Sequence, residues 1–158
     1  METENYLQIM INSLKKKKNV LQQIVAYNNE QESIVMASEF DGDKFQKNME
    51  DKSDCIDELN MLDDGFQSVY DRVKSELQEY KLNHKDDIFI LQQLIKEVTS
   101  LSATIQAQES RNKLQIERKF RQLRSETKTA KRSVSMANKY YKNMSRISYE
   151  PQFMDKKK

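Results

Sequence analysis

The sequence has very little of what tight turns and β-hairpins require. Its 158 residues include two glycines, one proline and no tryptophan. Hairpin turns depend strongly on glycine, so a fold rich in short strands is disfavoured. A third of the residues are charged, which suits narrow apolar seams between long helices better than a thick core. We therefore expect an all-α protein.

The residues that usually build catalytic and metal sites are also scarce. Cys55 is the only cysteine and His84 the only histidine, so neither an internal disulfide nor a cysteine-based zinc site can form. We find no glycine-rich phosphate loop, paired-histidine metal motif or nucleophile elbow. The sequence predicts a protein that is not an enzyme and holds no metal or cofactor.

Long apolar runs are missing as well. No stretch approaches the roughly 18 apolar residues that a membrane-spanning helix needs. The first four residues lack the basic start and apolar run of a signal peptide. We expect a cytoplasmic protein that does not insert into membranes.

Apolar residues recur at helical spacing along the whole chain. Leu7, Leu14 and Leu21 lie seven apart in a first helix over residues 5–37. Residues 40–44 form a connector in which an aspartate can cap a second helix, which ends near Tyr80. Gly65 lies inside this second helix, and we expect the helix to continue through it. With a third helix from Asp87, the pattern predicts an antiparallel coiled-coil bundle of three long helices.

The third helical segment is too long for the other two. Its apolar stripe is nearly empty over residues 106–113 and returns over 116–144. An unbroken helix over 87–145 would span roughly 90 Å, against roughly 50 to 57 Å for the first two helices. Two arrangements remain open. Either the third helix overhangs with a bare apolar stripe, or it breaks near 106–113 and folds back as a fourth helix.

Charge divides the chain into regions. Residues 1–110 hold 12 basic and 21 acidic side chains, a balance of −9, and residues 111–158 hold 15 basic and 4 acidic, a balance of +11. Within one domain we therefore distinguish an acidic helical body over 1–110, a basic amphipathic helix over 111–148 and a flexible basic tail over 149–158.

The basic helix is the best candidate for a binding site. An apolar stripe that lacks a helix of matching length needs a partner. We expect the partner to contact the residues of this stripe: Ile116, Phe120, Leu123, Val134, Ala137, Tyr141 and Met144. Arg118, Arg121 and Arg124 would steer an acidic partner toward it.

Other interpretations of the basic helix also stay open. Passive coiled-coil packing would explain the stripe equally well, and a bare stripe could pair with a second copy of the chain until a partner displaces it. Basic residues interleaved with Phe120, Tyr140 and Tyr141 are typical of nucleic-acid binding. Two of these aromatics belong to the apolar stripe, however, so helix packing accounts for them, and we expect no specific nucleic-acid complex.

Several segments, taken in order, resemble one known family. NNEQESIV is followed by FDGDKFQKNMEDKSDCIDELNMLDDGF, then by LIKEVTSLSATIQAQESRNK, and FMDKKK ends the chain. This order, over nearly the full length, is similar to the FlgN family of flagellar export chaperones in its Gram-positive form.

The resemblance implies a function for the basic helix. The chain would bind the C-terminal helical segments of hook-filament junction proteins (FlgK and FlgL), prevent their premature association and deliver them to the flagellar type III export apparatus. In this family the C-terminal region binds the client, and nearby tyrosines are implicated in docking at the export gate. Tyr140, Tyr141 and Tyr149 are the candidates in this sequence.

Overall fold

The computed structural model describes residues 2–123 and 128–144, and within this part of the chain all regular structure is helical. Three long helices, α1 (Glu2–Met36), α2 (Gly42–Glu79) and α3 (Lys85–Leu123), are followed by the shorter α4 (Lys128–Met144). A short 3₁₀ helix, η1 (Lys81–His84), joins α2 to α3. The all-α bundle predicted from the sequence is confirmed.

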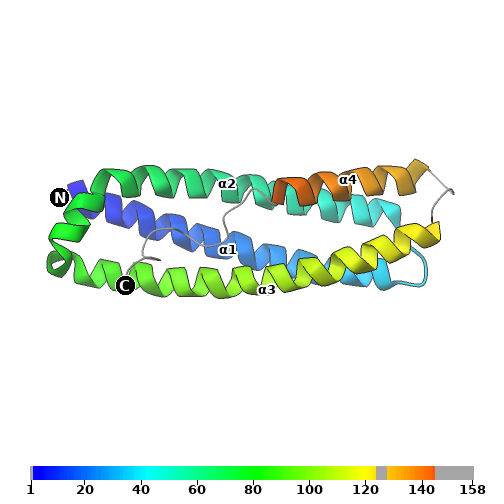
Figure 1. The fold of residues 1–158 in the computed structure, drawn as a ribbon, viewed down its shortest axis with the longest axis horizontal. Coiled ribbons are helices and arrows are strands. Elements are labelled where there is room, and N and C mark those ends of the chain that lie inside the picture. Colours follow the sequence, from blue (N-terminus) through cyan, green and yellow to red (C-terminus); the bar gives the residue numbers. More distant parts are fainter. Residues whose placement is uncertain (1, 124–127, 145–158) are drawn as a thin grey trace.

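The helices lie side by side along one long axis (Figure 1). The chain reverses direction between α1 and α2 and again between α2 and α3, and α1 packs against both of the other long helices. Helix α4 lies along the N-terminal half of α2, runs in the same direction and packs mainly against it. One end of the molecule is therefore built from four helices and the other from three.

The connector between α1 and α2 is capped as its sequence predicts. The Asp41 side chain accepts hydrogen bonds from the backbone N–H groups of Asp43 and Lys44, both at 3.1 Å. These groups have no partner within the helix, so the carboxylate supplies one. Helix α2 then continues without interruption past Gly65, as expected.

Two apolar clusters fill the bundle, one toward each end. The α4-end core joins all four helices and includes Leu21, Phe45, Val98, Ile116 and Tyr140. The far-end core joins α1, α2 and α3 and includes Leu7, Leu14, Phe66, Leu77 and Leu91. Because α4 contributes only to the first core, the far-end core can hold the three long helices together without it.

Neither of the two arrangements left open for the third helix is the observed one: α3 is continuous over residues 106–113, and the fourth helix that the second arrangement required begins later, at Lys128. The apolar stripe is interrupted, but Gln108, Glu109 and Asn112 keep its spacing and are buried in place of apolar residues. Polar side chains therefore continue the seam. The chain does supply a fourth helix, which begins only after α3 has reached Leu123.

Helix lengths explain where α3 ends. Helices α1, α2 and α3 contain 35, 38 and 39 residues, so each spans roughly 53 to 58 Å. The third helix thus ends where its neighbours end, and the remaining apolar stripe folds back along them as α4. The sequence-based boundary between the acidic body (1–110) and the basic helix (111–148) falls inside α3. It therefore marks a change of charge within a continuous helix.

Candidate functional site

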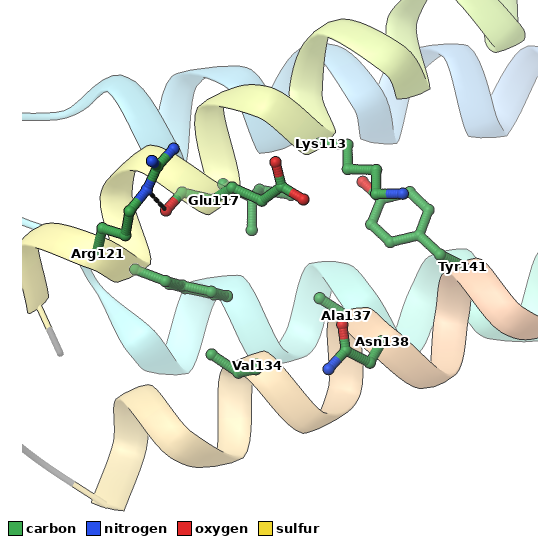
Figure 2. A pocket seen from close by; sticks show the side chains of 9 residues that line it. Lys113, Glu117, Arg121, Val134, Ala137, Asn138 and Tyr141 are labelled. Carbon is green, nitrogen blue, oxygen red and sulfur yellow. Dashed lines mark hydrogen bonds between the residues drawn. The ribbon is translucent and has the colours of Figure 1, made fainter. Parts of the chain in front are cut away.

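A groove separates α4 from the C-terminal part of α3. Its volume is about 460 Å³. Side chains from the two helices face each other across it (Figure 2). Apolar and aromatic side chains form most of the lining: Ile116, Phe120, Val134, Ala137 and Tyr141. The polar side chains of the lining are Lys113, Glu117, Arg121 and Asn138.

The groove exists because α4 lies closer to α2 than to α3. Ser133 and Ala137, one helical turn apart on α4, are 0% and 4% exposed. Such small side chains let α4 pack closely on α2, where its contacts are concentrated. Val134 and Tyr141, on the neighbouring face of α4, are only partly buried. The space between them and α3 remains open.

Aromatic packing sets the wall of the groove at the end of α3. Phe120 makes an edge-to-face contact with Phe45, with ring centroids 5.5 Å apart, and another with Phe40 at 6.0 Å. Ring pairs with this geometry contribute beyond their buried area. Phe120 therefore lines the groove and also holds the end of α3 against the connector between α1 and α2.

Three of the four polar side chains that line the groove lie on α3, and the fourth, Asn138, lies on α4. The Lys113 ammonium lies 5.5 Å from the centroid of the Tyr141 ring, and Arg121 Nε donates a 3.4 Å hydrogen bond to the Glu117 carbonyl oxygen. Burial, together with the nearby charges of Glu109 and Glu117, raises the pKa of Tyr141. The Tyr141 hydroxyl is itself buried, so the ring edge and not the hydroxyl forms the exposed part of this side chain in the groove.

The structure brings together most of the apolar residues predicted to bind a partner. Ile116, Phe120, Val134, Ala137 and Tyr141 all line the groove, although Ile116 and Ala137 are also part of the α4-end core. The remaining two do not line it. Leu123 is partly buried, and Met144 packs against the α4-end core.

The two described arginines among the three predicted to steer a partner lie at different sites. Arg121 lies at the groove. Arg118 lines a different hollow, of about 270 Å³, between α3 and the end of α1, together with Met36 and Lys119. Arg124 lies outside the described residues.

The tyrosines proposed to dock at an export gate are in different surroundings. Tyr140 is 1% exposed and packs in the α4-end core, whereas Tyr141 is partly exposed in the groove. Tyr149 lies outside the described residues, as does the predicted tail over 149–158. Docking through the Tyr140 side chain would require α4 to move away from α2 and α3.

Sequence reasoning missed a buried polar layer that adjoins the groove, where Tyr140 contacts Tyr141. Lys52 and Glu109 are 0% and 3% exposed and form a 3.0 Å ion pair between α2 and α3. Burial lowers the pKa of Lys52, and the charge of Glu109 opposes that change. Gln31 accepts a hydrogen bond from Lys52, and further buried amide side chains extend the layer from there: Asn28, Asn48, Gln108 and Asn112. The available signal was the spacing of residues 105, 108, 109, 112 and 116, in which polar residues at 108, 109 and 112 bridge the apolar Ile105 and Ile116.

The described residues contain no group of three or more histidine, cysteine or acidic side chains placed to bind a metal ion. Within the same part of the chain, no helix is long and apolar enough to cross a membrane. Comparison with known proteins finds no matching family model, no matching curated protein and no matching solved structure.

Proposed function

We propose that this protein is a cytoplasmic export chaperone that binds a helical segment of a client protein in the groove between α3 and α4. The clients would be hook-filament junction proteins of the FlgK and FlgL type, held through their C-terminal segments and delivered to the flagellar type III export apparatus. The groove carries the binding part of the proposal, and the FlgN resemblance of the sequence supports the identity of the clients.

The shape of the groove suits the apolar face of an amphipathic helix. Val134 and Tyr141 lie two helical turns apart on α4, and Ile116 and Phe120 lie one turn apart on α3. A helix laid between them would cover both rows with side chains at its own three- and four-residue spacing. Such a segment exposes an apolar face before assembly, so covering it suppresses wrong association.

Charge around the groove favours an acidic occupant. Residues 111–123 of α3 contain five basic side chains and one acidic, and α4 contains five basic and none acidic. Opposite charges across an interface speed association and reject partners of the wrong sign. The proposed client segment therefore carries acidic residues beside its apolar stripe.

Nucleic acid is a less well supported occupant. Binding of single strands commonly uses exposed aromatic rings on which bases stack. The Phe120 ring already packs against the rings of Phe40 and Phe45, and Tyr140 is buried in the core. Attraction to phosphates would remain, and it would be weak, unspecific and strongly reduced by salt.

Calorimetric titration with the C-terminal segment of a junction protein tests the proposal. We expect saturable one-to-one binding with a dissociation constant of about 1 μM or lower. A scrambled segment of identical composition should not bind, because it keeps the charge but loses the apolar face. Equal binding of both segments, or of neither, would overturn the proposal.

The later steps of the proposal involve other surfaces. Two of the three tyrosines proposed to dock at the export gate lie within the described residues. Of these two, Tyr141 is partly exposed and Tyr140 is buried, so we propose Tyr141 for this contact. Without a client, the same groove offers an apolar surface through which two copies of the chain can pair. Comparing the mass of the free and client-bound protein in solution tests this pairing, since client binding should convert a dimer to a one-to-one complex.

A further inference from the structure

All four helices meet at one buried polar cluster, formed by Gln31 on α1, Lys52 on α2, Glu109 on α3 and Tyr140 on α4. None of the four is more than 3% exposed. Lys52 Nζ donates to Glu109 Oε1 at 3.0 Å and to Gln31 Oε1 at 3.1 Å. The Tyr140 hydroxyl donates to Glu109 Oε2, and the Lys52 ammonium lies 4.3 Å from the centre of the Tyr140 ring.

Tyr140 is the one large side chain among the buried residues of α4 over residues 131–144. The other two buried side chains over residues 131–144 are Ser133 and Ala137, which are small. A helix face made of small side chains has few projections to fix its position, and a shift of one turn moves it by 5.4 Å. A directional hydrogen bond at Tyr140 opposes that shift.

We propose that Tyr140 is the positioning residue of the groove: through Glu109 it fixes α4 in the register at which Val134 and Tyr141 face α3. The inference deepens the proposed function, on which its biological meaning rests. The best-attested role of a buried polar contact between helices is of this kind, since a single polar residue in a helix seam can set its register.

The Glu109 carboxylate explains why displacement of α4 is costly. One oxygen accepts from Lys52 and the other from Tyr140. If α4 moves by one turn, the second oxygen loses its donor in a buried position, and Lys52 loses the aromatic ring beside it. Both oxygens of the Glu109 carboxylate thus have a donor only when α4 is in place.

Hydrogen–deuterium exchange of the full chain tests the proposal without any partner. Tyr140→Phe removes the hydroxyl and keeps the ring beside Lys52. We expect the amides of α4 to exchange roughly 10- to 100-fold faster, the effect of losing one hydrogen bond to a charged group in a locally opening helix. Amides of α1 and α3 should exchange at the rates of the unmodified protein.

Two controls separate positioning from general packing. Tyr27→Phe removes the hydroxyl of a partly buried tyrosine on α1 and should leave α4 exchange unchanged. In a Lys52→Met/Glu109→Leu background, which removes the charges together with the acceptor, Tyr140→Phe should produce no further acceleration.

Three results would overturn the inference. They are unchanged exchange of α4 in Tyr140→Phe, equal acceleration in all helices, and an undiminished effect of Tyr140→Phe in the Lys52→Met/Glu109→Leu background. Since no client is present, a failure of client binding in the calorimetric titration leaves these measurements unaffected. Failure of the inference and failure of the proposed function can therefore be told apart.

Discussion

At the scale of single residues, Cys55 shows how the acidic face of α2 alters a side chain. Its thiol is 5% exposed and lies 3.7 Å from Gln23 Oε1. Burial raises the pKa of Cys55 to about 11, and the charges of Glu58, Asp51 and Asp54 add to the effect. The thiolate is the reactive form, so at pH 8 roughly one thiol in a thousand is reactive.

We therefore predict slow alkylation of Cys55 by iodoacetamide in the folded protein. At pH 8 the labelling rate, followed by mass spectrometry, should rise steeply on unfolding in urea, which restores the ordinary thiol pKa. In the folded protein the rate should continue to rise as the pH approaches 11. By linkage, stability should fall between pH 9 and 11, because the unfolded thiol ionises first. Equal labelling rates with and without urea would contradict this account.

Most of the groove residues that could be predicted from the sequence are apolar, and Arg121 is the one polar residue among them. Ile116, Phe120, Val134 and Tyr141 follow helical spacing in the sequence, and the structure places all four in the groove. Lys52 could not be foreseen as buried, because a lysine between acidic residues has the same pattern in a solvated face as in a buried ion pair. The two cases differ in whether Glu109 and Tyr140, which are distant in the sequence, pack beside Lys52 in the folded protein.

At the scale of helices, Gly65 is a weak point in α2. It lies inside the helix and is exposed, and a Cβ atom built on it meets no other atom within 4 Å. We predict that Gly65→Ala stabilises the protein by about 0.5 to 1 kcal/mol, because alanine loses less conformational entropy in a helix. Thermal melting followed by circular dichroism measures the change. A lower melting temperature would show that α2 depends on glycine at this position.

The end of α3 is held by aromatic contacts, so Phe120 should matter for stability as well as for binding. We predict that Phe120→Ala lowers the free energy of unfolding by about 2 to 4 kcal/mol through loss of its contacts with Phe40 and Phe45. Leu114→Ala, at an exposed position on the same helix, should change it by less than about 0.5 kcal/mol. Urea denaturation measures both variants, and equal effects would contradict the packing described here.

The boundary between α1 and α2 was easier to predict from the sequence than the course of the third helix through residues 106–113. The connector at residues 40–44 carries local signals, an aspartate cap and a glycine, that act within a few residues. Residues 106–113 carry no such signal, because a polar segment of an apolar stripe is compatible both with a loop and with a buried polar layer. The layer is formed by partners on other helices, among them Asn28 and Gln31, which periodicity within one segment cannot reveal.

At the scale of the whole molecule, the bundle has two ends with different tasks. The far-end core joins only the three long helices, so it can keep them together whatever occupies the groove. The α4-end core combines apolar packing with the buried polar layer and carries α4. Under the proposed function, a partner would act on α4 and the groove while the far-end core keeps the three long helices together.

A substitution inside the groove tests the central claim most directly. Val134→Asp places a negative charge on the apolar wall of α4, and Met61→Asp makes the same kind of change at a 73% exposed position on α2 that does not line the groove. Both variants are titrated calorimetrically with the C-terminal segment of a junction protein. Hydrogen exchange of α4 is measured in parallel to show that the helix remains folded.

We predict that Val134→Asp raises the dissociation constant at least 30-fold, about 2 kcal/mol, because an anchor is lost and an acidic segment is repelled. Met61→Asp should leave the constant within about twofold of the unmodified protein. If Val134→Asp binds the segment as tightly as Met61→Asp while α4 remains protected, the groove between α3 and α4 is not the binding site.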